Sequence, residues 1–106
     1  MAVQKGASVQ LTLTTADTNY HLPDLVAAVD AAISKRCGSL VIQADPANAG
    51  NVLMGDALVS GTRYGAKLGA GDAHGISLHF NGASTEGIYL RPDTNAQKVN
   101  VEIGLV

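Results

Sequence analysis

The chain has 106 residues, a net charge of −2 and a single cysteine, Cys37, so an internal disulfide is excluded. Apolar residues make up 46% and charged residues only 15%, which favours one folded domain over residues 1–106 whose surface is partly buried against partners. Because the seven basic residues are scattered and no apolar run approaches a membrane span, we expect no nucleic-acid partner and no membrane segment. The opening MAVQKGAS lacks the apolar stretch of a signal peptide, so we expect synthesis in the cytoplasm without export.

The first forty residues predict a strand and then a helix. Residues 7–14 place Val9, Leu11 and Leu13 on one side and polar residues on the other, the period of a half-buried strand. After a polar connection, helical spacing begins at Leu22; its apolar residues are Leu22, Leu25, Val26, Val29 and Ile33. Pro23 and Asp24 suit the first turn, Lys35 and Arg36 suit the last, and Gly38 fits the position that follows the helix.

The middle of the chain predicts short strands and turns. Residues 39–44 and 51–54 are apolar runs around the turn-forming residues 45–50, which favours a hairpin, and residues 57–60 favour another short strand. Residues 61–75 are rich in glycine and predict an irregular surface connection.

The last third predicts a second hairpin and a closing strand. Residues 76–80 alternate, residues 81–87 are polar, and residues 88–91 are apolar again. Residues 99–105 set Val99, Val101, Ile103 and Leu105 against polar or small neighbours. In sum, we expect a mainly β fold, an antiparallel β-sandwich or small jelly-roll-like barrel with one helix inserted near the N-terminus.

The residues that could carry chemistry do not form a recognisable motif. The glycine-rich segment lacks the spacing of a phosphate-binding or dinucleotide-binding loop, and the three histidines, His21, His74 and His79, lack metal-ligand spacing. A carboxylate pair for glycoside hydrolysis would have to come from Asp56, Asp72, Glu86 and Glu102, which are dispersed and mostly in loops. We therefore expect no catalytic residue, no metal site, no cofactor and no enzymatic activity.

A recurring pattern covers residues 39–106. It consists of LVIQAD (40–45), NAGNVLMGD (48–56), LVS (58–60), GAKL (65–68) and GD (71–72), followed by IYL (88–90) and KVNVEI (98–103). This arrangement resembles the N-x-G-N-V-x-x-G-D-x-x-V-S pattern of small virion structural proteins of tailed phages. In this chain His74 interrupts the usual serine step, and residues 1–38 depart from the pattern.

The resemblance implies a small virion β-sandwich with no catalytic residues. Such proteins are found as capsid decoration or cement proteins, so the expectation is a protein made in the host cytoplasm that binds the major capsid protein on the outside of the virion. The alternatives are a tail, fibre or head-to-tail junction component, and a small carbohydrate-binding module, which would need an exposed aromatic platform.

The composition also suggests how the protein assembles. A low-charge chain with few aromatic residues has a limited core but a surface suited to burial, which predicts a homo-oligomer with a trimer as the first guess. Within the glycine-rich connection, Arg63, Tyr64 and Lys67 are the candidate interface residues, because Arg and aromatic side chains are enriched at interfaces.

Overall fold

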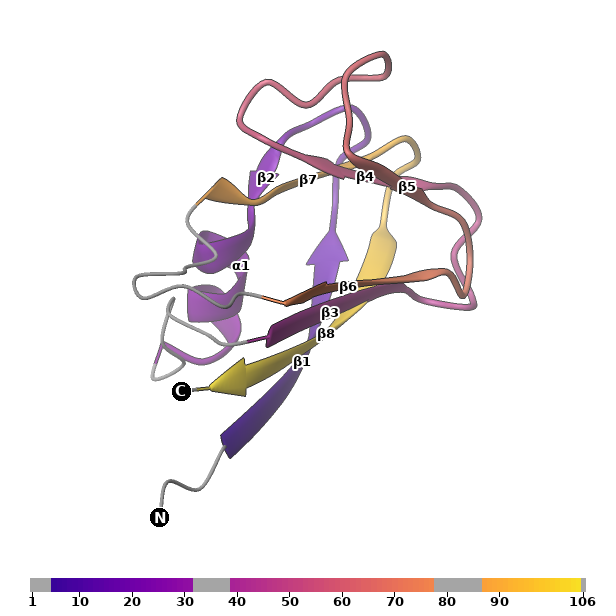
Figure 1. Ribbon diagram of the computed structural model, residues 1–106. Helices are drawn as coiled ribbons and strands as arrows, with labels where there is room; N and C mark the ends of the chain where they lie inside the picture. Colours follow the sequence, from indigo (N-terminus) through magenta and orange to yellow (C-terminus); the bar gives the residue numbers. More distant parts are fainter. Residues whose placement is uncertain (1–4, 32–38, 78–86, 106) are drawn as a thin grey trace.

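The computed structural model describes residues 5–31, 39–77 and 87–105, which form two antiparallel four-stranded sheets and one helix (Figure 1). Sheet 1 has the strand order β1-β8-β3-β6, and sheet 2 has the order β2-β7-β4-β5. The elements are β1 Lys5–Leu13, β2 Tyr20–His21, α1 Leu22–Val29, β3 Ser39–Ala44, β4 Val52–Gly55, β5 Ala66–Leu68, β6 Ala73–Ser77, β7 Tyr89–Pro92 and β8 Gln97–Leu105. The predicted mainly β sandwich with one helix near the N-terminus is confirmed.

The core lies between the two sheets and consists of aliphatic side chains. Sheet 1 contributes residues of β1, β3 and β8, and sheet 2 contributes residues of β4, β5 and β7; they are Leu11, Leu13, Leu40, Ile42, Ala44, Val99, Val101, Ile103, Val52, Met54, Leu68 and Leu90. The register predicted for the first and last strands is confirmed, because Leu11 and Val101 are buried while Glu102 is exposed. The helix closes one side of this core with Leu22 and Val26.

The helix is shorter than the sequence predicted. It ends at Val29, because Asp30 adopts an extended conformation (φ −151°, ψ 101°) while its N–H still donates to the Val26 carbonyl. Val29, which was expected on the buried face, is 56% exposed. The other residues expected at the helical end, together with Cys37, lie outside the described residues; they are Ile33, Lys35, Arg36 and Gly38.

Both predicted hairpins are wrong. β3 lies in sheet 1 between β8 and β6, whereas β4 lies in sheet 2 between β7 and β5, so residues 45–51 carry the chain across the sandwich. β6 and β7 likewise belong to different sheets. A turn signal shows that the chain reverses, but the choice between a hairpin and a crossing depends on partners far away in sequence, here β8 and β7.

The segment after β4 also differs from the prediction. Residues 57–60 form a turn rather than a strand, and only Ser60 makes an isolated bridge, to Arg63. The glycine-rich residues 61–75, expected to be irregular, contain β5 and the beginning of β6, which pair with β4 and β3. β4 and β5 therefore form the hairpin, with the loop 56–65 between them.

The crossing at residues 45–51 is fixed by hydrogen bonds to the β7–β8 connection and to the first residues of β8. The Asn48 side chain donates to the Lys98 carbonyl (2.7 Å) and accepts from the Lys98 N–H (2.8 Å). Gln97 is buried, and its amide accepts from the Gly50 N–H and donates to the Asn95 carbonyl. A Cβ at Gly50 would overlap the side chains of residues 93 and 94, so only glycine fits this close approach.

Asp93 completes this attachment. Its carboxylate accepts from the backbone N–H of Asn51 (2.8 Å) and from the Asn51 side chain (3.2 Å). Partial burial alone would raise the pKa of Asp93, but the hydrogen bonds from Asn51 and Thr94 outweigh it, so the pKa lies below its ordinary value of 3.8. The ionised form therefore stabilises the folded state.

The register of β8 predicts opposite outcomes at two neighbouring positions. Val101→Asp places a carboxylate without a partner in the core, and we expect it to cost several kcal/mol, a large part of the stability of a small domain. Glu102→Gln, on the exposed face of the same strand, should change the free energy of unfolding by less than about half a kcal/mol. Thermal or urea unfolding measures both, and equal losses would contradict the register.

Asp93 predicts how stability depends on pH. Because its pKa is lower in the folded than in the unfolded protein, its contribution is fully present above the ordinary pKa and is lost as pH falls through the folded pKa. Asp93→Asn should therefore lower the free energy of unfolding near neutral pH and weaken its decline in acid. Urea unfolding at a series of pH values measures this; an unchanged acid decline would rule out the role assigned to Asp93.

Candidate functional site

The loop 56–65 folds back over the outer face of sheet 2. Leu53 lies on β4 between the core residues Val52 and Met54, so it faces away from the core, yet it is only 6% exposed. Val59, in the loop, is 1% exposed and also lies outside the main core cluster. A Cβ at Gly55 would come within 3.2 Å of the Val59 side chain, so the loop approaches the sheet closely there. The loop thus has an apolar attachment of its own.

Backbone hydrogen bonds give the loop a defined shape. The Val59 N–H donates to the Asp56 carbonyl (3.0 Å), and Ser60 and Arg63 exchange two backbone hydrogen bonds (2.9 and 3.2 Å). The Gly65 N–H donates to the Met54 carbonyl (2.7 Å), which returns the chain to the sheet. These hydrogen bonds hold the two sides of the loop together and join its end to β4.

An ion pair joins the two ends of this loop. Arg63 Nη2 lies 2.7 Å from Asp56 Oδ2, and a second Asp56 oxygen accepts from the Leu58 N–H. The hydrogen bond from Arg63 lowers the pKa of Asp56, and the same bond raises the pKa of Arg63. Both side chains are more than half exposed (61% and 54%), so solvent screens the pair and its main effect is to set the loop's shape.

The loop carries two exposed apolar side chains, one of which, Tyr64, lines a shallow hollow. Leu58 is 68% exposed and Tyr64 is 45% exposed. The hollow has a volume of about 280 Å³ and is lined by Gly55, Asp56, Arg63, Tyr64 and Gly65. A tyrosine and an arginine are side chains of the kind that anchor protein interfaces, and the exposed leucine on the same loop adds apolar surface.

The structure brings together two of the three predicted interface residues. Arg63 and Tyr64 both line the hollow. Lys67 is exposed on the neighbouring strand β5, across from Leu53, and does not line it. The sequence does not single out Leu58, because residues 57–60 predict a strand; a large apolar residue two positions after the turn-forming Asp56 is the available signal.

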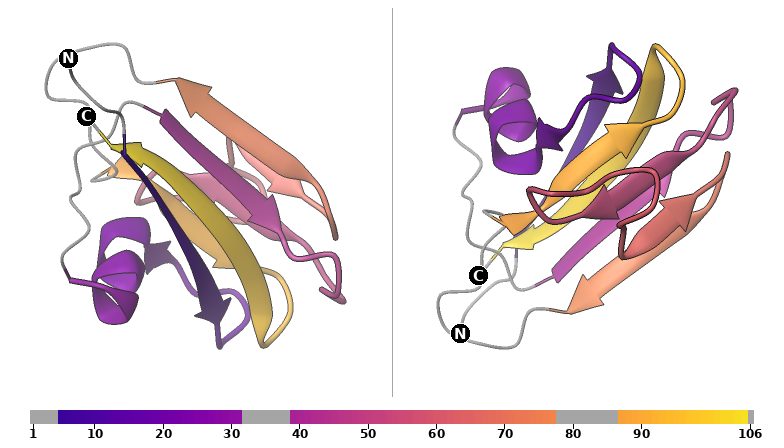
Figure 2. Two further views of the ribbon diagram at one scale, coloured as in Figure 1. Left: turned by 90° about the horizontal axis from the view of Figure 1, so that it is seen from below. Right: turned by 90° about the horizontal axis from the view of Figure 1, so that it is seen from above.

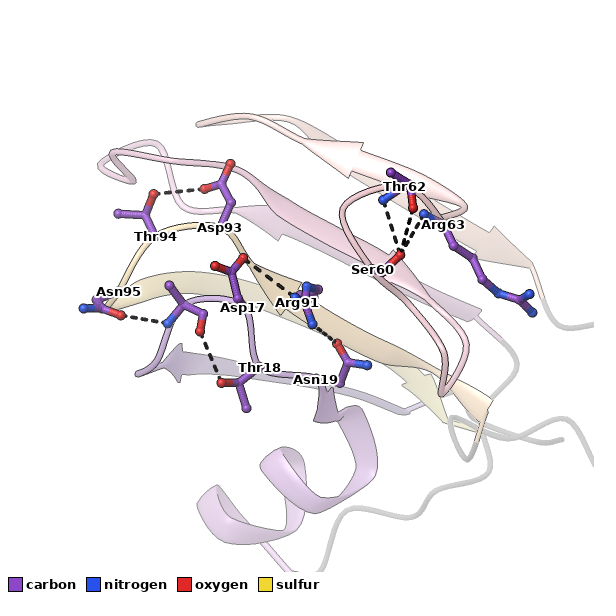
Figure 3. A network of polar contacts seen from close by, with 11 residues as sticks. Asp17, Thr18, Asn19, Ser60, Thr62, Arg63, Arg91, Asp93, Thr94 and Asn95 are labelled. Atoms are coloured by element: carbon purple, nitrogen blue, oxygen red, sulfur yellow. Dashed lines mark hydrogen bonds and ion pairs between the residues drawn. The ribbon is translucent and has the colours of Figure 1, made fainter.

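A polar network beside the loop holds the connection after β1 (Figure 3). Arg91 of β7 donates to the Asn19 side chain (3.0 Å) and lies 3.9 Å from Asp17 Oδ1. The Asn19 amide in turn donates to the Ala57 carbonyl of the loop 56–65 (3.3 Å). Arg91 lies on the same outer face of sheet 2 as the loop 56–65. Its guanidinium contacts Asn19 and Asp17, so its role is to hold the connection after β1 in place.

The other residues considered for chemistry are placed apart. His21 Nδ1 lies 3.1 Å from Asp24 Oδ2, and its ring stacks on Tyr89 at 4.6 Å. Asp72 accepts from the Gly69 N–H in a turn, and Glu102 lies on the outside of sheet 1, whereas Asp56 lies over sheet 2. His79 and Glu86 lie outside the described residues.

The described part of the chain contains neither a metal-binding group of side chains nor a membrane-spanning helix. Within residues 5–31, 39–77 and 87–105, no three His, Cys, Asp or Glu side chains are grouped closely enough to hold a metal ion. The helix in the same residues is too short to cross a membrane.

Comparison of the chain with family models, with curated proteins and with solved structures found no match.

The contact between the loop 56–65 and sheet 2 predicts that shortening the Val59 side chain has a local effect. Val59→Ala removes buried methyl groups from the loop's contact with sheet 2, and we expect a loss of about 1–3 kcal/mol. Amide exchange in residues 56–65 should accelerate more than exchange in β8. Leu58→Ala, one residue away and exposed, should change the free energy of unfolding by less than about half a kcal/mol. Similar losses in both variants would show that Val59 does not anchor the loop.

Proposed function

We propose that this protein is a non-enzymatic structural protein of a tailed-phage virion, a capsid decoration or cement protein that binds the major capsid protein on the outer shell. The observation that carries the proposal is the loop 56–65, which displays Leu58 and Tyr64 to solvent from a backbone that is already ordered. Through this loop the protein would reinforce contacts between neighbouring shell subunits. It would act at the virion surface after synthesis in the host cytoplasm.

The order of the loop favours a role in binding. Exposed apolar side chains on a fixed backbone lose little conformational entropy when a partner covers them, so a modest area contributes efficiently to affinity. The Asp56–Arg63 pair is neutral as a unit, and burial of both partners together leaves no uncompensated charge at the interface. On a symmetric shell the same patch acts many times.

The charged side chains around the loop support a structural role. Asp93 fixes the crossing after β3, Arg91 fixes the connection after β1, and Asp56 fixes the loop itself. Each of these groups is engaged by a partner within the fold, where it holds a connection in place. A rigid module of this kind suits an assembly part whose shape must be constant from copy to copy.

The same surface would serve a tail, fibre or head-to-tail junction component, which is the first alternative. The two roles differ in copy number and position. A density map of the virion that shows the protein distributed over the shell supports decoration, and one that shows it only on the tail axis supports the alternative.

A carbohydrate-binding module is the second alternative, and one observation favours it: Tyr64 beside Asp56 and Arg63 could stack on a sugar ring and hydrogen-bond its hydroxyl groups. Tyr89 is half-buried against His21, and the Tyr20 hydroxyl accepts from the Thr15 N–H, so these rings do not extend the surface of Tyr64. Titration with glycans would separate this alternative from protein docking.

The docking role predicts the effect of removing the exposed anchors. Leu58→Ala combined with Tyr64→Ala should weaken attachment to virion particles by about tenfold or more, as expected for central interface anchors. The melting temperature of the isolated protein should hardly change, because both side chains are exposed. Val41→Ala, which trims a 42% exposed residue on sheet 1, is the matched control and should bind normally. Undiminished binding by the double variant would remove the loop from the interface.

A further inference from the structure

β1 forms by far the longest free edge of the sandwich. Its nine residues pair with β8, and none of the other described strands pairs with its opposite side. The other three sheet edges are β2, β5 and β6, with two, three and five residues. Figure 2 shows β1 at the margin of sheet 1, with α1 alongside.

In the described part of the chain, β1 lacks most of the devices that protect a sheet edge. Natural proteins keep edge strands from pairing with other chains by shortness, proline, bulges, charge or a covering element. The register runs unbroken from Lys5↔Leu105 to Leu13↔Gln97, so no bulge interrupts it, and the strand KGASVQLTL has no proline and one charge, at its end. With eight residues α1 is about 12 Å long, whereas β1 spans about 30 Å, so the helix covers less than half of the edge.

We propose that β1 pairs with β1 of a second copy in an antiparallel, two-fold arrangement that joins two copies of sheet 1 into one continuous sheet. Two identical strands bring identical side chains together, so a strand that pairs with itself must avoid like charges. The outward residues Ser8, Gln10 and Thr12 meet this requirement. A pair centred on Val9 places Val9 opposite itself and Ser8 opposite Gln10 of the second copy.

The incomplete burial of inward-facing residues also supports a second copy of the chain at the β1 edge. Leu11 and Leu13 are buried, but Val9, on the same side of β1, is only half-buried. On α1, which packs against β1, Leu25 is half-buried and Val29 is 56% exposed. A second copy at this edge would cover apolar surface that the position of β1 leaves in contact with water.

The inference deepens the self-association expected of an assembly part, and it does not depend on capsid attachment. Self-association is thereby assigned to the β1 edge and to a two-fold axis. A two-fold contact between two β1 strands forms a closed dimer, whereas the composition predicts a trimer. The oligomer number therefore distinguishes the two predictions.

The test places like charges at the proposed contact. Ser8→Lys combined with Gln10→Lys should raise the dimer dissociation constant by about tenfold or more, because like charges then oppose each other across the two-fold axis. The monomer should tolerate both changes, since Glu102 lies across from Ser8, and the Asp45 carboxylate already accepts a hydrogen bond from Gln10. Val41→Lys combined with Ala73→Lys adds the same charge to the same face away from β1, and should leave the constant unchanged within about twofold.

Sedimentation equilibrium across a micromolar concentration series reads out both variants and the parent protein. A parent dimer that dissociates in the edge variant and persists in the control supports the proposal. A monomeric or trimeric parent, or a dimer that the edge charges do not weaken, overturns it. Binding of the edge variant to virion particles tests capsid attachment separately, because Leu58 and Tyr64 are unchanged in that variant.

Discussion

The pairing of β8 with two strands is the interaction on which the rest of this structure depends. β8 lies in sheet 1 between β1, which it contacts along nine residues, and β3. Its inward residues Val99, Val101 and Ile103 are all buried, so the same strand supplies ladder hydrogen bonds and core. Since β1 and β8 come from opposite ends of the chain, the sheet forms only when the whole chain has been brought together. Because this pair joins segments that are far apart in sequence, its formation carries loop-closure entropy and is expected to slow folding.

Polar side chains hold the segments that connect sheet 1 with sheet 2. Asn48 and Gln97 use both ends of their amides, and Asp93 uses both carboxylate oxygens, to join the two crossings. Arg91 hydrogen-bonds to Asn19, and Asn19 hydrogen-bonds to the loop 56–65, so these polar contacts extend to the loop. The order of that loop is thus a consequence of how the sheets are connected, and the loop can display Leu58 and Tyr64 without becoming mobile itself.

The sequence predicted what local periodicity controls and missed what distant partners control. The alternation in β1 and β8 identified Leu11 and Val101 as buried, because a strand buried on one face alternates apolar and polar residues along the sequence. The same turn residues that suggested hairpins at 45–50 and 81–87 are equally compatible with crossings, and the pairing of β3 with β8 is not visible locally. Arg63 and Tyr64 were identified as surface anchors by residue type, but the burial of Val59 depends on the close approach at Gly55, which no periodicity reveals.

The two surfaces proposed for assembly belong to different sheets of the sandwich. In sheet 1 the edge strands are β1 and β6, and in sheet 2 they are β2 and β5; α1 contacts both β1 and β2, while β5 contacts β6. The loop 56–65 lies over the outer face of sheet 2 and reaches the Asn19 side chain beside β2 through the Ala57 carbonyl, so it does not belong to the β1 edge of sheet 1. A pair formed through β1 would therefore leave the loop, on sheet 2, outside the strand pairing in both copies and able to reach neighbouring subunits of a shell. Self-association and attachment would then reinforce each other, because each bound dimer engages the surface at two points and gains the effective concentration of an intramolecular contact.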